Sequence, residues 1–366
     1  MSTGKRVAVV FGGRSVEHEI SLRSARTVMD ALSQAGFQPL PVAVTHQGTW
    51  LSGPPAQSLL EGGESPKGGS SIALMPDPQI RGLAAPAAGG GWDRLPVDVV
   101  FPLIHGIGGE DGTLQGVLEL ADLPYVGSDV TSSALGMSKR LQRRLWHGAG
   151  LPVLETVEIH RRDWEQDPEG QTRRILEKIG VPCFLKPSGS GSSVGVGLAH
   201  SAEEIPARVL EAARYDEYVL ADRAVDAREL ECAVLGNREP RATTPGEIIP
   251  QREFYDYQAK YLEDTTRLVI PAEVDRECVQ EARRLASEAF RCLGCSGLAR
   301  VDFFLDKQTG ELILNEINTL PGFTSISMYP NLWAHEGMEL PELVGQLVEL
   351  AMERHAEVQR SRRTLA

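Results

Sequence analysis

Four polar side chains near the C-terminal end of the chain have the spacing of a cation site. Arg300 and Asp302 lie two residues apart in one apolar, β-prone run, and Glu316 and Asn318 lie two apart in the next. Because side chains alternate along a strand, each pair projects from one face. The sequence Asp-Lys-Gln-Thr-Gly at 306–310 predicts a hairpin turn between the runs. A connection of three or five residues would set residue 300 opposite 316 and bring the four groups together, whereas a connection of four would separate them.

These polar groups are costly to bury without partners, because the runs around them are apolar. A hard cation held by their oxygen atoms, with the arginine beside it, would satisfy them. An Arg–Glu ion pair at the end of a sheet would explain the same residues without any ligand. The four positions alone do not decide between a metal site and an ion pair.

A loop rich in glycine and serine follows another strand-like run. It reads Lys-Pro-Ser-Gly-Ser-Gly-Ser-Ser-Val-Gly-Val-Gly over residues 186–197. Backbone N–H groups of such a loop can close over phosphate oxygens, and Lys186 adds a point charge. The lysine precedes the glycines, so this is not a Walker-type P-loop, and a flexible surface hairpin is the alternative. Lys139 would be a second phosphate lysine or an ordinary solvated charge on a helix.

Two loops near the N-terminus could contact a small substrate. The stretch Phe-Gly-Gly-Arg-Ser-Val-Glu-His at 11–18 lacks the third glycine of a dinucleotide fingerprint, and no acid ends the following strand. A helix beginning at Ser21 would instead favour a bound carboxylate, and Glu17 beside it would hold an ammonium. That combination suits an amino acid. His105, in the glycine-rich stretch 105–112, would contact substrate, carry a proton or serve a structural role.

Alternating strands and helices must position these N-terminal loops. The expected elements are strands at 7–11, 38–44 and 97–101, a helix from Ser21 to residue 32, and a helix at 113–121. This alternation is typical of an open α/β sheet with sites at the carboxyl ends of its strands. Residues 47–95, rich in Gly, Pro, Ser and Ala, are expected to form a partly ordered insertion with little chemistry.

The rest of the chain indicates two further units of mixed α and β structure. The elements expected in the first unit are a helix at 133–148 and strands at 153–160, 183–186 and 218–220. Those expected in the second are a long irregular segment at 240–271, a helix at 273–293, the polar hairpin and a C-terminal helix at 341–363. The phosphate loop therefore belongs to one unit and the polar hairpin to the other.

The composition of the 366-residue chain argues against several classes of function. Asp and Glu number 50 against 37 Lys and Arg, which gives a net charge of −13, and no basic stripe is present to neutralise a nucleic-acid backbone. No apolar run reaches the ~20 residues that cross a bilayer. No secretory signal precedes the first strand. We therefore expect a cytoplasmic protein that binds neither nucleic acid nor membrane.

Six motifs in this chain match those of a known family in type and order. They are GGRSVEHEISLRSA at 12–25, HGIGGEDGTLQG at 105–116, KPSGSGSSVGV at 186–196, FYDYQAKY at 254–261, GLARVDFF at 297–304 and NEINTLPGFTSISMYP at 315–330. With these motifs the chain resembles the D-alanine–D-alanine ligases of the ATP-grasp superfamily. The resemblance implies an N-terminal α/β domain at 1–128, a central domain with the phosphate loop at 129–221, and a C-terminal domain with the metal site and a mobile ω-loop at 222–366.

The resemblance also implies which residues bind ATP and two Mg²⁺ or Mn²⁺ ions. The matching positions are Lys139, Lys186, Lys260, Gly191, Ser193 and Val194 for the phosphates, Asp302, Glu316 and Asn318 for the metal ions, and Asp222 and Glu229 for the adenosine. The family carries a glutamate where this chain has Asp222 and a glycine where it has Ala227. The side chain of Asp222 is one methylene shorter than the glutamate of the family.

A second group of positions is implied to handle the amino acids. They are Glu17 for the ammonium of the first D-alanine, Ser327 and Met328 for the carboxylate of the second, Arg300 and the Gly322 N–H for the acyl phosphate and tetrahedral intermediate, and Tyr261 with Ser192 for the closed lid. We take His105 as a further substrate contact. The D-alanine–D-lactate ligases lack the tyrosine pattern around Tyr261, so this residue favours an amine as the nucleophile.

The implied reaction joins two D-alanine molecules through a D-alanyl phosphate, at the expense of ATP, for peptidoglycan synthesis. The family also implies a homodimer, and the sequence leaves a monovalent cation open. A ligase for D-lactate or another acid is one alternative. A non-catalytic nucleotide-binding protein is the other, but it would have lost Arg300, Asp302, Glu316 or Asn318, and all four are present.

Overall fold

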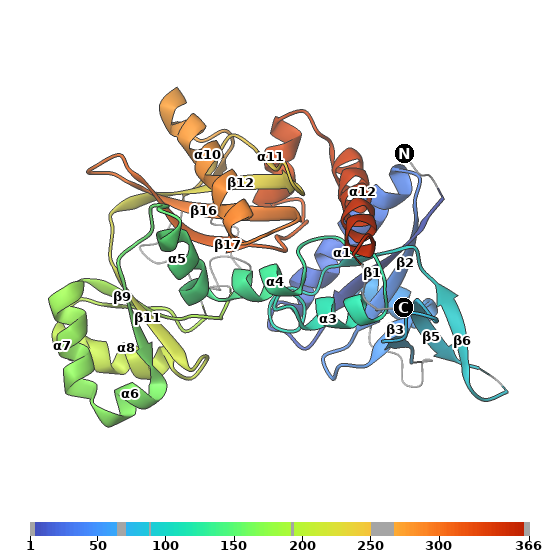
Figure 1. Cartoon of the computed structure of the whole chain (residues 1–366), viewed down its shortest axis with the longest axis horizontal. Coiled ribbons are helices and arrows are strands. Elements are labelled where there is room, and N and C mark those ends of the chain that lie inside the picture. The colour runs from blue at the N-terminus through green and yellow to red at the C-terminus, as the bar shows by residue number, and fades with distance from the viewer. Residues whose placement is uncertain (1–3, 64–70, 88, 192–193, 250–266, 362–366) are drawn as a thin grey trace.

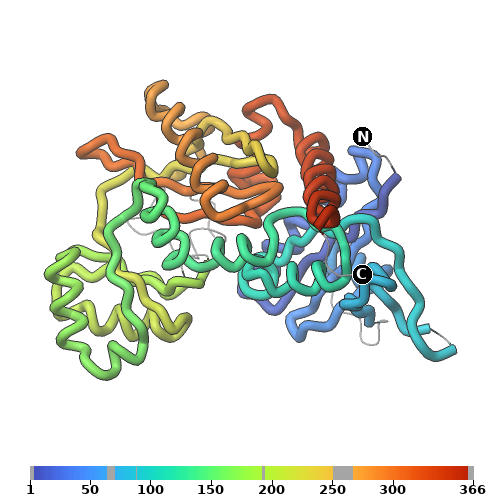
Figure 2. Tube along the Cα trace, viewed as in Figure 1, coloured from blue at the N-terminus to red at the C-terminus, as the bar shows by residue number. Residues whose placement is uncertain are grey.

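The computed structural model describes residues 4–63, 71–87, 89–191, 194–249 and 267–361. Figure 1 shows three groups of strands, each with its own helices. In Figure 2 the N-terminal part, in blue, and the central part, in green, lie at opposite ends of the molecule, with the C-terminal part, in orange and red, between and above them. None of the helices in these ranges is both long and apolar enough to cross a membrane.

The N-terminal sheet has the order β3-β2-β1-β7. Its strands are β1 (Arg6–Gly12), β2 (Gln38–Val44), β3 (Trp50–Ser52) and β7 (Val99–Pro102). β1 is parallel to both β2 and β7, as the alternation of strands and helices predicted. Val7, Val9 and Phe11 face one hydrophobic cluster, while Ala8 and Val10 face another. The strand is therefore covered on both sides, which explains its continuous apolar run.

The first helix begins earlier than expected. α1 spans His18–Gln34, so Ser21 lies inside it and Glu17 occupies the N-cap position. The hydroxyl of Ser21 accepts a hydrogen bond from the Gly12 N–H at 2.7 Å and donates one to the Leu103 carbonyl. The expected carboxylate site at a helix start on Ser21 is therefore wrong, because that hydroxyl ties α1 to the ends of β1 and β7.

The insertion at 47–95 is more regular than expected. It contains α2 (Pro54–Leu60) and an antiparallel sheet of β4 (Ala73–Met75), β5 (Gly82–Pro86) and β6 (Trp92–Pro96). Beyond it, α3 (Thr113–Leu120) covers the N-terminal sheet and ends one residue before the expected boundary. The insertion lies at the outer end of the molecule in Figure 1, away from the polar hairpin.

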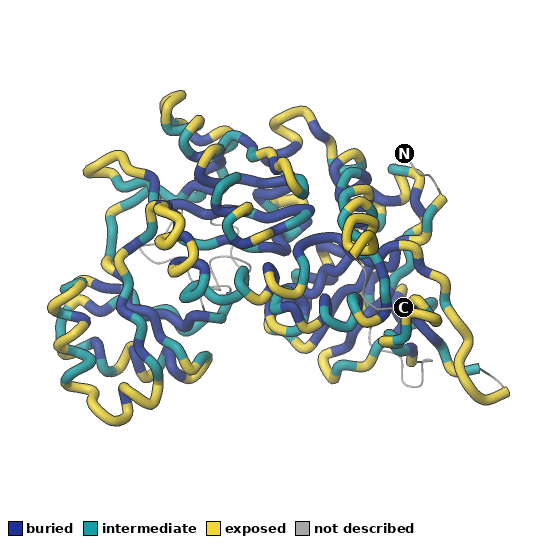
Figure 3. The backbone as a smooth tube through the Cα atoms, in the orientation of Figure 1, coloured by how far each residue is buried: buried dark blue, intermediate teal, exposed yellow. Residues whose placement is uncertain are grey.

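The central sheet is antiparallel, with the order β10-β9-β11-β8. Its strands are β8 (Thr156–His160), β9 (Cys183–Pro187), β10 (Gly197–Ala199) and β11 (Tyr218–Arg223). The helices packed on it are α6 (Arg161–Gln166), α7 (Pro168–Lys178) and α8 (Ile205–Ala212), the last preceded by the short 3₁₀ helix η1 (Ala202–Glu204). Figure 3 shows the buried chain following the strands and the exposed chain following the outer helices.

One expected helix is in fact two. α4 (Val130–Met137) and α5 (Lys139–Gly148) replace the single helix predicted at 133–148. Ser138 interrupts them with an extended backbone, and its hydroxyl accepts a hydrogen bond from the Leu141 N–H as the N-cap of α5. Lys139 therefore becomes the first residue of a helix instead of a residue within one.

The C-terminal sheet has the order β15-β14-β12-β16-β17. Its strands are β12 (Ala227–Gly236), β14 (Gly246–Ile249), β15 (Arg267–Val269), β16 (Gly297–Asp306) and β17 (Leu312–Asn318), and β13 (Arg241–Ala242) pairs with β12. α10 (Arg276–Cys292) packs on one face of this sheet. α11 (Met328–His335) was not predicted, and α12 runs over Leu340–Gln359. α11 and α12 share one hydrophobic cluster with β1 and α1, so the N-terminal and C-terminal parts are packed together.

Candidate functional site

The polar hairpin places its four residues on one face of the C-terminal sheet. Asp302 lies opposite Glu316, and Arg300 lies opposite Asn318. The expected opposition of 300 and 316 is therefore wrong, although the connection between β16 and β17 has five residues, Lys307–Glu311. A β-bulge beside Asp302 shifts the register, and the expected convergence of the four groups is confirmed.

The next strand extends this polar face with a carboxylate that the sequence reasoning missed. Glu231 on β12 lies opposite Asp302, and Glu229 lies two residues earlier on the same face. The guanidinium of Arg300 donates two hydrogen bonds of 2.7 Å to the carboxylate of Asp302, and its Nε lies 3.1 Å from Glu231 Oε2. Burial opposes a charge there, yet Asp302 and Glu231 hold the pKa of Arg300 above its usual range. The alternation Glu-Leu-Glu at 229–231 was the signal that could have found Glu231.

The donors on this face fit a hard divalent cation. Asp302 and Glu316 are carboxylates, and Asn318 offers an amide oxygen that accepts the Leu320 N–H at 2.9 Å. Oxygen ligands of this kind suit Mg²⁺. Two cations neutralise the carboxylates here, since Arg300 bonds Asp302 and the ammonium of Lys139 lies 2.8 Å from Glu316 Oε2. The residues expected to bind metal are therefore close together and within reach of side chains that are expected to neutralise phosphate.

The two lysines expected to bind phosphate approach the hairpin from different elements. Lys139 also donates to the Ser190 carbonyl at 2.9 Å, which ties the start of α5 to the glycine-rich loop. Lys186 on β9 lies 2.8 Å from Asp222 Oδ2 and 3.5 Å from Asn315 Oδ1. Burial, followed by the nearby guanidinium of Arg143, lowers the pKa of Lys186 to about 8.

One described end of the glycine-rich loop, Gly191, lies near Glu17. A Cβ atom built on Gly191 would lie 3.5 Å from Glu17 Oε2, and the Val194 N–H donates to the Gly191 carbonyl at 3.2 Å. Ser192 and Ser193 lie outside the described residues, as do Lys260 and Tyr261, so the expectations about them stay predictions.

A cavity of about 530 Å³ opens over the polar face. Most of the residues that line the cavity belong to α1, the loop after β7, the hairpin and the segment before α11. The predicted site residues that line it are Glu17, His105, Gly191, Arg300, Glu316, Asn318, Gly322, Ser327 and Met328. Lys139, Lys186, Val194, Asp222, Glu229 and Asp302 are not among its lining residues. The cavity thus gathers the residues expected to handle amino acids, and the phosphate lysines lie beyond it.

His105 is buried in the cavity wall, where it contacts three segments. Its Nδ1 lies 3.3 Å from Glu110 Oε1 and 3.1 Å from the Leu320 carbonyl, and its Nε2 lies 3.3 Å from the Ser24 hydroxyl. Burial alone would lower the pKa of His105, but the hydrogen bond and charge of Glu110 raise it. Burial raises the pKa of Glu110. The sequence reasoning did not single out Glu110, although this residue follows His105 in the same loop.

The segment that leads into α11 forms the opposite wall. Ser327 holds the N-cap position of α11, and its hydroxyl accepts the Thr324 N–H at 2.9 Å. A Cβ atom on Gly322 would lie 3.0 Å from the Ser327 hydroxyl, so this turn leaves little room for a larger residue. The first N–H groups of a helix favour a carboxylate. Ser327 and Met328 begin α11 and line the cavity, so the N-terminus of α11 is a place in the cavity wall that favours a carboxylate.

Asp222, which the resemblance assigned to the adenosine, is buried and paired with protein groups. It is 2% exposed, and both of its carboxylate oxygens contact protein groups: Oδ1 accepts from Arg143 and Thr156, and Oδ2 lies beside Lys186. Two cations hold the pKa of Asp222 below its usual range against the effect of burial. Glu229 lies on the polar face of β12, opposite Ile248 and Phe304.

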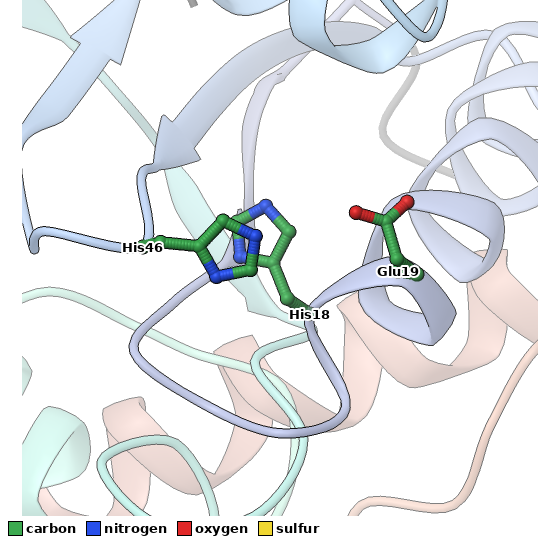
Figure 4. Close-up of side chains that lie close together, drawn as sticks. All are labelled: His18, Glu19 and His46. Carbon is green, nitrogen blue, oxygen red and sulfur yellow. The ribbon is translucent and has the colours of Figure 1, made fainter.

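A second group of potential metal ligands lies beside β1 (Figure 4), and none of its members is among the lining residues of the cavity. The donor atoms of His18, Glu19 and His46 all lie within 4.8 Å of one another. The rings of His18 and His46 are stacked, with centroids 3.7 Å apart and planes 23° apart. A metal ion binds in the plane of an imidazole at about 2.0–2.1 Å. Nearly parallel stacked planes do not meet that close to both rings, so we assign no metal to this group.

Comparisons with known proteins identify the family. Residues 6–128 match the family model described as D-ala D-ala ligase N-terminus, and residues 145–349 match the one described as D-ala D-ala ligase C-terminus. The chain belongs to the D-alanine–D-alanine ligase family. This result confirms the family that the six motifs indicated, and with it the ATP-grasp fold and the assignment as an enzyme.

Relatives within the family align along nearly the whole chain. The D-alanine–D-alanine ligase of Thermoanaerobacter sp. (strain X514) is 45% identical over 354 residues, covering 96% of this chain and 98% of the relative. That of Geobacillus kaustophilus is 42% identical over 355 residues, covering 97% and 96%. Among solved structures, the D-alanine–D-alanine ligase from Coxiella burnetii has a TM-score of 0.83 at 34% identity, covering 98% of this chain and 97% of its own. The VanG D-Ala:D-Ser ligase from Enterococcus faecalis has a TM-score of 0.85 at 34% identity, covering 95% and 100%.

Proposed function

We propose that this enzyme joins two D-alanine molecules into D-alanyl-D-alanine with ATP as the energy source. The carboxylate of the first D-alanine attacks the γ-phosphate, which gives an acyl phosphate and ADP. The amine of the second then attacks the acyl carbon and releases phosphate. The observation that carries the proposal is that one cavity is lined by Glu17, Arg300 and Glu316. These residues supply a carboxylate for an ammonium, a guanidinium, and a carboxylate of the hairpin proposed to bind metal.

Charge neutralisation is the main task of the site, because phosphoryl transfer needs little covalent chemistry from the protein. Asp302, Glu316 and Asn318 would hold two divalent cations, Mg²⁺ or Mn²⁺, which neutralise the phosphates of bound ATP. Lys139 and Lys186 supply further positive charge from two sides. The loop Gly191–Val194 would cover the phosphates with its N–H groups.

The amino acids occupy the other half of the cavity. Glu17 accepts the ammonium of the first D-alanine, and Arg300 with the Gly322 N–H stabilises negative charge on the acyl phosphate and the tetrahedral intermediate. Ser327 and Met328, at the start of α11, receive the carboxylate of the second D-alanine. His105, paired with Glu110, holds the wall between the two amino acids.

Several further features belong to this proposal. The separate N-terminal, central and C-terminal sheets support three domains with a first boundary near 128. The second boundary would follow β11, which continues past 221 to Arg223. Glu229 would serve the adenosine, whereas Asp222 is held in the buried cluster with Arg143 and Lys186. Lys260 and Tyr261 would act from the lid. We place the enzyme in the cytoplasm, where ATP and peptidoglycan precursors meet, and expect a homodimer.

A D-serine ligase is the second candidate, because the VanG structure has a comparable TM-score. The deciding experiment measures phosphate release from ATP and Mg²⁺ with D-alanine alone, and with D-alanine plus D-serine or D-lactate, and identifies the products by mass. One D-alanyl-D-alanine per phosphate with D-alanine alone supports the proposal. A mixed product that dominates at equal concentrations of the two amino acids would support the D-serine enzyme, and no stimulation by any of them would refute both.

A further inference from the structure

A buried cluster of charges lies between α5 and the central sheet. Asp222 on β11 lies directly opposite Thr156 on β8, and Lys186 lies on the same face of β9. Arg143 reaches this face from α5. The exposed fractions are 5% for Arg143, 9% for Lys186 and 2% for Asp222. Charges this deeply buried are held only when their partners are well placed.

The carboxylate of Asp222 is divided between two cations. Oδ1 accepts from Arg143 Nη1 and, at 2.8 Å, from the Thr156 hydroxyl, while Oδ2 lies 2.8 Å from Lys186 Nζ. Thr156 also accepts a hydrogen bond of 2.6 Å from Arg143 Nη1. One negative charge therefore faces two positive ones, and the cluster of three ionised groups carries a net charge of +1.

The cluster also contains hydrogen-bond donors without a partner among the described residues. Arg143 Nε and Nη2 are buried, and neither has a hydrogen-bond partner among the residues that the structure describes. A buried positive excess is unfavourable in the free protein, which agrees with the low pKa of Lys186. An anion placed beside Lys186 would balance the excess. The cluster is thus arranged as the edge of an anion site, in agreement with the phosphate role proposed for Lys186.

α5 connects this cluster to the metal hairpin. Lys139 and Arg143 are four residues apart on the helix, so they share a face. Lys139 contacts Glu316, and Arg143 contacts Asp222. Trp146, three residues on from Arg143, is fully buried in the hydrophobic cluster of the C-terminal sheet, and its ring N–H donates to the Ala289 carbonyl at 3.2 Å. The face of α5 that carries Arg143 is therefore held firmly against both sheets.

We propose that Arg143 is a positioning residue for nucleotide binding, which shares the carboxylate of Asp222 so that the cluster around Lys186 keeps a net positive charge for the phosphates of ATP. Without Arg143, Lys186 and Asp222 would form a neutral pair, and the ammonium would be held by the carboxylate instead of the nucleotide. Arg143 itself acts through Asp222. The inference rests on the proposed function for the assignment of Lys186 to ATP.

The test compares Arg143→Gln with Arg144→Gln. Arg144 is the next residue of α5, its side chain is 60% exposed and pairs with Glu158 at the surface, and nothing in the proposal involves it. Titration calorimetry with Mg²⁺ and ADP measures nucleotide affinity without turnover. We expect the Kd to rise about tenfold or more in Arg143→Gln, as for loss of a charge-assisted contact, and to stay within about twofold of wild type in Arg144→Gln. In kinetics the KM for ATP should rise while the KM for D-alanine stays unchanged.

Arg143→Lys should restore most of the affinity, because it restores the charge while its ammonium lacks the fork of the guanidinium. If Arg143→Gln is unfolded by circular dichroism, Arg143→Met removes the charge without burying an amide and gives the same comparison. A folded charge-free variant with a lowered melting temperature but unchanged Kd for ADP would overturn the proposal, since Arg143 would then be structural only. A wild-type protein that binds ADP but forms no dipeptide would refute the proposed reaction and leave the role of Arg143 in nucleotide binding to be decided by the Kd values.

Discussion

Raising the pH above 8 should weaken ATP binding through a single lysine. Lys186 lies on β9 at the edge of the proposed phosphate site and is 9% exposed. Its burial, and then the charge of Arg143, lower its pKa from 10.5 to about 8, although Asp222 acts in the opposite direction. The ammonium is therefore present below pH 8 and is lost as the pH rises through that value. Its contact with phosphate should be lost over the same range.

The size of the effect follows from the pKa. One pH unit above a pKa of about 8, roughly one tenth of the free protein keeps the ammonium, so the Kd for ATP should rise about tenfold between pH 7 and pH 9. A charge-assisted hydrogen bond contributes about 1.5–3 kcal/mol, so the rise should level off at about 10- to 150-fold. The unfolded chain binds more protons than the folded protein between pH 8 and 10.5. The free energy of unfolding that this lysine contributes should therefore increase with pH in that window.

Calorimetric titration of ATP at constant Mg²⁺, without D-alanine, measures the Kd from pH 7 to 9.5. The terminal phosphate, with a pKa of about 6, is ionised throughout, so the nucleotide does not titrate. Lys186→Gln is the control, and it should bind ATP more weakly at pH 7 and show a flat profile above it. A wild-type Kd that stays within twofold across the range would refute the assignment of Lys186 to the phosphates.

Two further predictions concern the metal face and the cavity wall. Glu316→Gln should lower turnover about a hundredfold and raise the Mg²⁺ concentration needed for half-maximal rate, because an amide replaces a carboxylate beside divalent ions; near-normal rates at low Mg²⁺ would contradict the metal assignment. Ser24→Ala should lower stability by about 1–3 kcal/mol in thermal denaturation, because the Phe323 N–H and the His105 ring both lose their contact with the buried hydroxyl. An unchanged melting temperature would show that water replaces the hydroxyl there.

The bounds of secondary-structure elements were predicted well from the sequence wherever local patterns determine structure. β2 has the predicted bounds, and β1 is one residue longer than predicted at each end, because uninterrupted apolar runs define buried strands. The sequence was a poor guide where a polar residue ends an element without a break in periodicity. Ser138 lies in a helical pattern, yet it ends α4 and caps α5. In the insertion, glycine and proline suggested irregular chain, but β4, β5 and β6 pair through backbone hydrogen bonds that composition does not report.

The residues of the candidate site also fall into those that the sequence indicated and those that it did not. Motif resemblance located Glu17, Lys139, Lys186 and the hairpin residues, because these lie in short contiguous stretches. The sequence predicted that Arg143 lies on a solvated helix face with Arg140 and Arg144, since a charge on an amphipathic helix is usually solvated. For Arg143 this prediction is wrong, because its side chain is buried. Its burial depends on Asp222, which lies far along the chain on the central sheet. Local sequence therefore indicated the groups that we propose to contact ligand better than the groups that hold them in place.

The β-bulge in the polar hairpin had a signal in the sequence. A regular ladder continued from the pair Phe303–Leu314 would set Glu316 opposite Val301, on the apolar face that packs against α10. Burying a carboxylate there is costly, whereas one unpaired residue, Asn315, moves Glu316 to the face of Asp302.

The apolar positions of β17 show the same shift. Leu312, Leu314 and Ile317 all belong to the core cluster, but Leu314 and Ile317 are three residues apart, which a regular strand cannot place on one face. The break in alternation, and not the length of the turn, is what determines that the four polar residues converge. The Oδ1 atom of Asn315, which is left out of the ladder, lies 3.5 Å from Lys186 Nζ. The irregularity that brings the four polar residues together therefore also brings the hairpin to the lysine that we propose for phosphate.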